Sequence, residues 1–303
     1  MKAELTFRPE QRLGLVFHVV AIAVLAAAAG LGLWQAMGAS VGPVFLMYLL
    51  PGLMAAAATP LLAYRAYALR TAVYTLEREG IRLRWGLRLE DIPMDAVKWV
   101  HRAAELRMAL PLPRLRWPGS VVGVQRAAGL GEVEFMAGDA RQLVLIGTPG
   151  RVYAISPANP AAFLNGFQRV TEMGSLSPLP ARSLYPTVLL RRVWADRPAR
   201  ALLLGGLALS LLLLIWVSLA IPGRSQVSLR FLPDGMPGEL IPSVRLLLPV
   251  LNAIFYLVDV LLGLFFFRRS DSQPLAYLLW GSGALSPVLF LVGTFFILQA
   301  SSG

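Results

Sequence analysis

The sequence predicts a polytopic α-helical membrane protein with a water-soluble β domain inserted between its spans. Of its 303 residues, 56% are hydrophobic and only 15% are charged. The mean hydropathy of +0.63 exceeds that of an ordinary soluble domain. The apolar residues form about five segments of the roughly 20 residues that cross a hydrocarbon core. These segments contain neither Lys nor Arg and cover residues 13–36, 42–64, 201–222, 246–267 and 275–299.

The distribution of Lys and Arg predicts the orientation. With five spans, the N-terminus, the middle segment and the turn at 268–269 share one side of the membrane. The other side holds only Arg224, Arg230 and Arg245 of the 28 Lys and Arg residues. Because basic residues concentrate on the cytoplasmic side, we expect the N-terminus and the middle domain in the cytoplasm and the C-terminus outside. The net charge of +11 follows from this topology, and no nucleic-acid recognition motif accompanies it.

The middle segment has the alternation of a half-buried antiparallel meander. Ile81, Leu83 and Trp85 alternate with arginines, and Gly86 ends the run. Further strands are expected near residues 72–77, 87–92, 96–103, 119–125 and 132–137. Residues 143–148 and 151–155 flank the turn signal Pro149-Gly150 and predict a hairpin. The segment therefore carries about seven short strands.

A short amphipathic helix is predicted directly after this hairpin. Asn159 occupies an N-cap position, and Pro160 follows in the first turn, which tolerates a missing N–H. Phe163, Phe167 and Val170 then recur at helical spacing. Such a helix buries one face against a small sheet, as in a water-soluble domain.

Two motifs in this segment resemble those of the bacterial PH-like (pleckstrin-homology-like) domain family. The opening has the form Y-x-L-x-x-x-G-I and leads to a strand that ends at I-P, and the closing has the form Y-x-I-S-P-x-x-P-x-x-F. The resemblance implies a cytoplasmic PH-like β-barrel of about seven antiparallel strands with a C-terminal capping helix, in a protein of the bacterial plasma membrane. The matching residues are Tyr74, Gly80, Ile81, Ile92, Pro93, Tyr153, Ser156, Pro157, Pro160 and Phe163.

These observations divide the chain into four regions. Residues 1–68 are expected to form a two-span hairpin, and residues 69–174 the PH-like domain. Residues 175–200 contain a Ser/Pro-rich linker and a short interfacial helix, and residues 201–303 hold the remaining three spans.

The last third also resembles, more faintly, an uncharacterised membrane module of the domain-of-unknown-function type. Its external loop passes through a G-x-P turn to an L-L-P span start. The matching residues are Gly235, Pro237, Leu247, Leu248, Pro249 and Gly263.

Searches for catalytic chemistry return no constellation, so no catalytic residue, cofactor or metal site is expected and the chain is not predicted to be an enzyme. The P-loop, zinc-protease and dinucleotide motifs are missing. Residues 38–42 have the spacing of a nucleophile elbow but lie in the turn between two spans. The acidic residues of the meander are expected on a solvated surface; they are Glu77, Glu79, Glu90, Asp91 and Asp95.

A long basic loop is the first candidate binding site. Arg107, Arg114, Arg116 and Trp117 lie between two predicted strands. Trp prefers the membrane interface and Arg is attracted to anionic lipid, so the loop has the composition of a lipid-headgroup contact. The alternative is a scaffold loop that is solvated or faces the membrane without a ligand.

Asp259, near the middle of the fourth span, is the second candidate. An ionisable group at this depth is costly and marks a polar partner, a bundle interior or an ion path. Asn252 lies seven residues earlier on the same helical face. The plainest interpretation is a structural hydrogen bond to Ser282, Ser286 or Thr294 of the next span. The alternatives are a proton or ion role, and a misplaced span or a cavity-facing position.

The function predicted from these features is a non-catalytic protein-interaction or scaffolding module at the membrane. Its edge strands, or the groove beside the capping helix, would accept a partner's peptide by strand addition. The expected partners are the bilayer and a protein or a second copy of the chain, without nucleic acid. Two alternatives remain, a small transporter or channel-like component that uses Asp259, and an anionic lipid-headgroup sensor that uses the basic loop.

Overall fold

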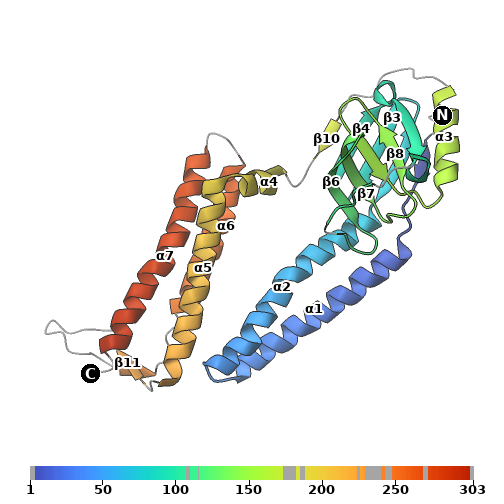
Figure 1. The fold of residues 1–303 in the computed structure, drawn as a ribbon. Coiled ribbons are helices and arrows are strands. Elements are labelled where there is room, and N and C mark those ends of the chain that lie inside the picture. Colours follow the sequence, from blue (N-terminus) through green and yellow to red (C-terminus); the bar gives the residue numbers. More distant parts are fainter. Residues whose placement is uncertain are drawn as a thin grey trace. The chain divides into compact units, whose positions relative to one another are not determined.

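The computed structural model contains the five expected long helices together with a β domain (Figure 1). Each of the five is long and apolar enough to cross a membrane. They are α1 (Arg12–Gly38), α2 (Pro43–Arg70), α5 (Arg197–Ala220), α6 (Leu248–Phe267) and α7 (Gln273–Ala300). The structure describes residues 4–106, 110–114, 116–172, 182–184, 188–223, 226–228, 240–242, 248–268 and 272–300.

The chain divides into two compact units. The first comprises residues 1–28 and 55–186, and the second comprises residues 29–54 and 187–303. The helices α1 and α2, joined by a short turn, are here called the membrane hairpin, and each of them has residues in both units.

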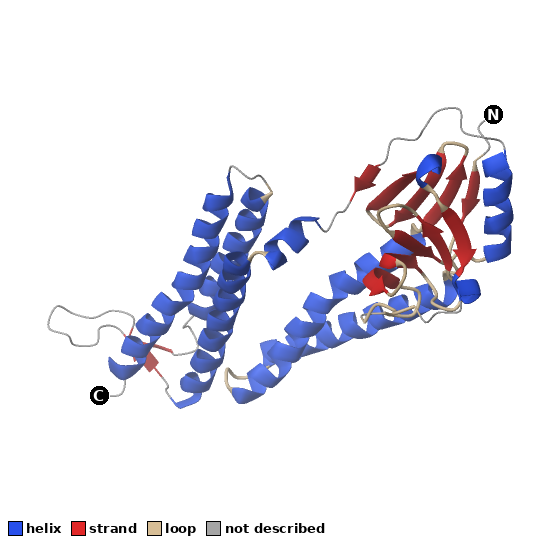
Figure 2. Ribbon diagram, turned by 45° about the horizontal axis from the view of Figure 1, so that its top comes forward, coloured by secondary structure: helices blue, strands red, loops and turns tan. Residues whose placement is uncertain are grey.

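The first unit contains two five-stranded sheets (Figure 2). The first sheet has the order β1-β2-β3-β4-β10, and all its neighbouring strands are antiparallel. The central meander agrees with the alternation of Ile81, Leu83 and Trp85, whose side chains are buried. The strands are β1 (Leu5–Phe7), β2 (Val73–Glu77), β3 (Gly80–Trp85), β4 (Arg88–Pro93) and β10 (Arg182–Leu184).

The second sheet has the order β5-β8-β9-β7-β6. The expected hairpin at Pro149-Gly150 is confirmed by the antiparallel pair β8 and β9. In contrast, β7 and β9 are parallel, because the hairpin of β8 and β9 lies between β5 and β7. The strands are β5 (Trp99–Arg102), β6 (Val121–Ala127), β7 (Gly131–Ala137), β8 (Val144–Gly147) and β9 (Val152–Ile155).

The prediction of a closed barrel of about seven antiparallel strands is therefore wrong. Between residues 73 and 155 there are eight strands, from β2 to β9, and they belong to two separate sheets. The sheets gain β1 and β10 from segments outside the predicted strands. Alternation along one strand shows which face is buried, but it does not show which strand lies beside it or in which direction.

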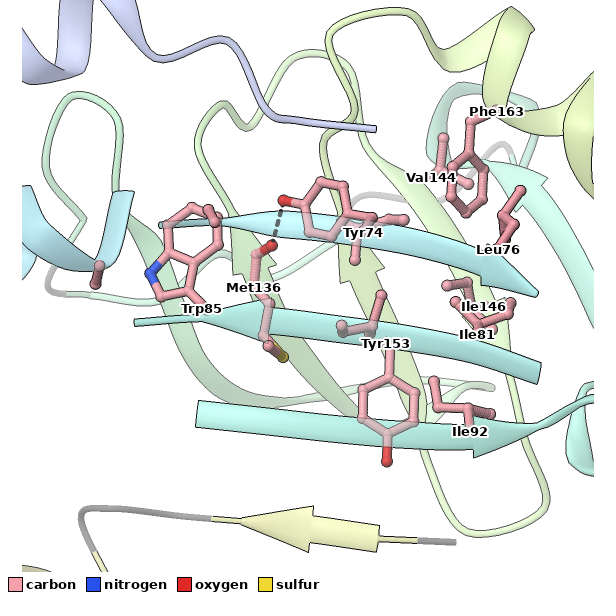
Figure 3. Packing of buried hydrophobic residues seen from close by; sticks show 14 of the residues in the cluster. Tyr74, Leu76, Ile81, Trp85, Ile92, Met136, Val144, Ile146, Tyr153 and Phe163 are labelled. Atoms are coloured by element: carbon pink, nitrogen blue, oxygen red, sulfur yellow. Dashed lines mark hydrogen bonds between the residues drawn. The ribbon is translucent and has the colours of Figure 1, made fainter. Parts of the chain in front are cut away.

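The main core lies between the two sheets and is covered by α3 (Pro160–Glu172), which contacts β2 of the first sheet and β5 of the second. Ile81 and Ile92 meet Ile146 from the opposite sheet (Figure 3). Phe163 of α3 is fully buried and packs edge-to-face on Phe7 of β1. The predicted helix start is confirmed, because the Asn159 side chain accepts a hydrogen bond from the Ala162 N–H at 3.0 Å.

The membrane hairpin is an insertion between two paired strands. β1 precedes α1 and β2 follows α2, and the two strands pair directly, with Phe7 opposite Tyr74. Both ends of the hairpin therefore enter the same sheet. This arrangement places the β domain beside the ends of both helices.

The second unit contains a bundle of α5, α6 and α7. The short helix α4 (Val188–Ala195) precedes α5, and its Val193 packs into a cluster with Phe267 and Trp280. A Cβ on Gly263 would lie 2.1 Å from the Trp280 ring nitrogen, so the missing side chain makes room for this indole between α6 and α7. The remaining elements are the pair β11 (Gln226–Ser228) and β12 (Leu240–Pro242), with one-turn 3₁₀ helices at Met94–Ala96, Ala103–Leu106 and Ile221–Gly223.

Candidate functional site

The β domain is fixed to the membrane hairpin by close backbone contacts. The Gln11 side-chain amide donates a hydrogen bond to the Leu69 carbonyl at 2.7 Å and so joins α1 to α2. A Cβ on Gly14 of α1 would lie 2.6 Å from the Cα of Gly119, in the turn before β6. Leu69 is fully buried in the main core of the domain. The domain therefore shares its core with the end of the second span.

The outer strands of the first sheet, β1 and β10, have only three residues each. The edge of β2 is paired with β1, and the edge of β4 is paired with β10. In the second sheet β5 and β6 are the outer strands, and within the described part of the chain no strand pairs with their outer edges. β5 and β6 have four and seven residues, so their edges offer more backbone groups for strand addition by another chain than the edges of β1 and β10 do.

β5 contacts α3, and its outer edge is partly protected by a side chain of the same chain. The Arg102 N–H donates to the Glu105 carboxylate at 3.4 Å. The N–H of the next residue, Ala103, donates instead to the Leu143 carbonyl at 2.9 Å. The His101 imidazole lies 3.6 Å from the same carboxylate, and both side chains are half exposed. The Glu105 side chain therefore bonds to a backbone N–H group that a partner strand would use.

A buried charged network connects β4 of the first sheet with β7 and β9 of the second. Glu134 on β7 is only 1% exposed and forms ion pairs with Arg88 and, at 3.0 Å, with Arg151. Arg88 also lies 3.6 Å from the Glu90 carboxylate, and the Tyr153 hydroxyl donates to Glu90 at 2.6 Å. The network joins the sheets through charge-assisted bonds.

Two tyrosines of the PH-like motif link the sheets in the same way. The Tyr74 hydroxyl on β2 donates to the Met136 carbonyl on β7 at 2.7 Å (Figure 3). Burial raises the pKa of Tyr74 above its ordinary value. Burial, and then the hydrogen bond to Glu90, raise the pKa of Tyr153. Both phenols therefore remain neutral hydrogen-bond donors at physiological pH.

The other motif residues also have structural positions. Ser156 accepts hydrogen bonds from the Gly138 and Asp139 N–H groups at 2.7 and 3.2 Å. Pro157 bridges to Pro9 of the N-terminal segment, and Pro160 begins α3. Gly80 and Ile81 begin β3, while Ile92 and Pro93 end β4. The motif builds the fold and leaves the binding surface to other residues.

The predicted solvated surface for the acidic residues is wrong at two positions. Glu90 and Asp91 are buried, at 6% and 8% exposure. Glu90 belongs to the network of Glu134, and Asp91 accepts a hydrogen bond from Arg82 of β3 at 2.8 Å. Glu134 and Arg88 were not singled out from the sequence at all. The alternation in "EVEFMA" predicts that Glu134 faces solvent, so no sequence signal identified it as buried.

The basic loop lies partly over the outer face of the second sheet. Leu106, Leu110 and Leu112 are half-buried against a second apolar cluster that includes Phe135 and Leu145. Of the candidate headgroup residues, Arg114, Arg116 and Trp117 are exposed, whereas Arg107 lies outside the described residues. Trp117 lies against the membrane hairpin, with its ring 5.4 Å from the Arg65 guanidinium carbon.

The two intramembrane polar residues of α6 contact different helices. The Ser282 hydroxyl of α7 donates to the Asp259 carboxylate at 3.2 Å. The Asn252 side chain donates to the Ser210 hydroxyl of α5 at 2.9 Å. A Cβ on Gly283 would lie 3.2 Å from the Asp259 Cβ, so α6 and α7 approach closely at this point. The geometry is that of interhelical hydrogen bonds.

Asp259→Asn is therefore expected to leave the bundle intact, because the amide oxygen can still accept the bond from Ser282. Asp259→Leu removes the acceptor and is expected to cost about 1 kcal/mol, the usual size of an interhelical hydrogen bond. Thermal unfolding of the full chain in detergent measures both changes. Equal losses of stability for the two variants would contradict the hydrogen-bond role. A proton or ion flux through the full chain that Asp259→Asn abolishes would indicate a proton or ion role.

Metal binding has no support in the described residues, among which no group of three His, Asp or Glu side chains is placed to hold an ion. The C-terminal module resemblance stays a prediction. Gly235, Pro237 and Leu247 of its pattern lie outside the described residues, while Leu248 and Pro249 begin α6. Its Gly263 has the packing role described above for Trp280.

The comparisons with known proteins identify the β domain. A comparison with curated proteins found no match to the chain, and a comparison with solved structures found none either. Residues 72–170 match the family model described as "Bacterial PH domain". The match begins just before β2 and ends in α3, so it covers the strands from β2 to β9 and most of the capping helix. The two-sheet domain on the membrane hairpin is thus a bacterial PH-like domain.

Proposed function

We propose that the chain is a membrane-anchored interaction module that binds an extended segment of a protein partner along the outer edge of β5. The observation that carries this proposal is the difference between the two sheets. The first sheet ends in the three-residue strands β1 and β10, whereas β5 has four residues, and no strand among the described residues pairs with its outer edge. PH-like folds are interaction modules, and strand addition at a sheet edge is a common way to bind an extended peptide.

The environment of β5 supports this choice of edge. α3 contacts β5, so a strand added at this edge would lie near the capping helix. Glu105 occupies the Arg102 N–H only weakly, at 3.4 Å, and an exposed charged side chain of this kind is a usual protection of an unpaired edge. A partner strand replaces this contact with a backbone hydrogen bond.

The membrane hairpin supports a role at the bilayer surface. Because the hairpin is inserted between β1 and β2, the domain is attached at both helix ends. The Lys and Arg distribution favours the cytoplasmic side of a bacterial plasma membrane for the domain. In this proposal the chain acts by binding, and its activity is to hold a protein partner at the membrane.

Arg102→Pro tests the proposed edge. Proline removes the outward N–H that a partner strand would use, and proline is tolerated on edge strands, so the fold is expected to persist. We expect a crosslinked pull-down from native membranes to lose a discrete protein with Arg102→Pro and to retain it with Arg102→Ala, which keeps the N–H. Retention of the same partners by both variants would contradict binding along β5.

A further inference from the structure

A second surface of the PH-like domain lies at the level where the membrane hairpin leaves the apolar layer. Besides Gly119, the turn between β3 and β4 approaches α2. Gly86 has a positive φ of 62°, and a Cβ on it would lie 2.9 Å from the Ala68 Cβ and 3.3 Å from the Tyr64 hydroxyl. Two turns of the domain therefore pack directly against the hairpin, next to the last turns of α2.

The sequence of α2 marks the depth of this contact. Its apolar segment ends at Tyr64, and Arg65 is its first charged residue. The rings of Tyr64 and Tyr67 lie 6.4 Å apart and are 39% and 44% exposed. Exposed aromatic rings at the end of a span are typical of the membrane–water interface. Because Gly86 touches Tyr64, the residue that follows it, Leu87, lies close to this interface.

The exposed apolar side chains of the domain gather in these turns. Among the described residues from β2 to α3, the large hydrophobic side chains that are exposed are Leu87 (58%), Trp117 (38%) and Val124 (45%). Leu87 belongs to the first turn and Trp117 to the second. The Trp117 ring also lies 5.8 Å from Phe17 of α1. Both turns thus present an apolar side chain beside the hairpin, where solvent exposure is costly and an interfacial lipid layer is favourable.

Two side-chain nitrogens without a hydrogen-bond partner among the described residues lie at the same level. Gly14 of α1 lies beside Leu69 of α2. Because the two helices run antiparallel, His18 of α1 and Arg65 of α2, each one turn further into the hairpin, lie at the same height along it. Within the described residues, His18 Nε2 and Arg65 Nη1 are both buried without a hydrogen-bond partner. Such groups normally have a partner.

We propose that this surface is a lipid-binding face. Leu87 and Trp117 enter the interfacial layer of the adjacent leaflet, and Arg65, Arg114 and Arg116 bind the phosphates of anionic lipids. Arg65 is held in place by its stacking on Trp117, and the exposed Arg114 and Arg116 precede Trp117 in the chain by three residues and one residue. The face lies on turns that differ from the β5 edge, so it is independent of the proposed protein partner.

A labelling experiment on the full chain tests the proposal. The sequence contains no cysteine, so Leu87→Cys creates a single site for an environment-sensitive fluorophore. Ala128→Cys is the matched control, because Ala128 is exposed at the end of β6 opposite to the Trp117 turn. Both proteins are reconstituted into vesicles of phosphatidylcholine, with or without phosphatidylglycerol, that contain a lipid with a nitroxide quencher near the headgroup.

We expect quenching of the label at residue 87 to exceed that at residue 128 several-fold and to increase with phosphatidylglycerol. Combining Arg114→Glu and Arg116→Glu with Leu87→Cys is expected to abolish the increase. Equal quenching at residues 87 and 128 would overturn insertion of the turn. An increase that is absent, or that persists in the double glutamate variant, would overturn phosphate binding by these arginines.

Discussion

Glu134→Gln is expected to destabilise the PH-like domain by about 3–5 kcal/mol, the usual cost of removing one partner from a buried ion pair. The glutamine has nearly the same volume, so the loss measures charge and not packing. Glu134 is only 1% exposed and forms ion pairs with Arg88 of β4 and Arg151, at the start of β9. Its neutralisation leaves two guanidinium groups without this carboxylate and weakens the link between the sheets.

Glu132→Gln is the matched control on the same strand. Its carboxylate lies 3.8 Å from Arg126, and both side chains are largely exposed, at 48% and 87%. Such surface pairs contribute about 0–1 kcal/mol. Hydrogen exchange of the β7 and β9 amides in the full chain measures both losses. A loss for Glu134→Gln as small as that for Glu132→Gln would show that the buried network does not hold the sheets together.

Gly14→Ala is expected to separate the turn at Gly119 from the membrane hairpin. The new methyl group would lie 2.6 Å from the Gly119 Cα and 2.6 Å from a Leu69 methyl carbon. Backbone cannot move aside as a flexible side chain does, so the overpacking is expected to cost about 1–3 kcal/mol. The measurement is hydrogen exchange at Ser120, whose N–H bonds to the Trp117 carbonyl at 2.9 Å.

Gly30→Ala controls for the change of residue type in the same helix. A Cβ at Gly30 has no neighbouring atom within 4 Å, and alanine is the better helix former by about 0.5–1 kcal/mol. We expect Gly30→Ala to leave Ser120 protected and Gly14→Ala to expose it. Equal protection in both variants would contradict the close docking of the domain on α1.

The sequence predicted those parts of the fold that depend on local pattern. The five long helices, the hairpin at Pro149-Gly150 and the helix start at Asn159 all follow from hydrophobic runs, turn residues and capping. The two sheets depend instead on pairing between distant segments. β1 and β10 have three residues each, too few for alternation to mark them, and they are ordered by the strands beside them.

The site shows the same limit at the level of single residues. Glu132 and Glu134 alternate with apolar neighbours in "EVEFMA", so the pattern predicts that both side chains face solvent. Glu134 is nevertheless buried, because Arg88 of β4 and Arg151, which immediately precedes β9, approach it. Trp117 was identified as a residue of the interface type from composition. Its contacts with Phe17 and Arg65 required the packing of the turn on the hairpin.

The insertion of the hairpin between β1 and β2 relates the membrane region to the proposed function. A domain on a single flexible tether samples many orientations, whereas two attachments and a shared core at Leu69 restrict them. A partner bound along β5 would therefore be held in a defined orientation to the hairpin. Restricting both partners before they meet reduces the entropy lost on binding.

Site-specific photo-crosslinking in native membranes tests the proposed function most directly. A photoreactive amino acid replaces His101 on β5, which is 53% exposed, or Arg126 on β6, which is 87% exposed. The account predicts a discrete protein adduct from residue 101 that is weak or absent from residue 126 and disappears with Arg102→Pro. Adducts of equal yield from both positions, or an adduct at residue 101 that survives Arg102→Pro, would contradict strand addition along β5.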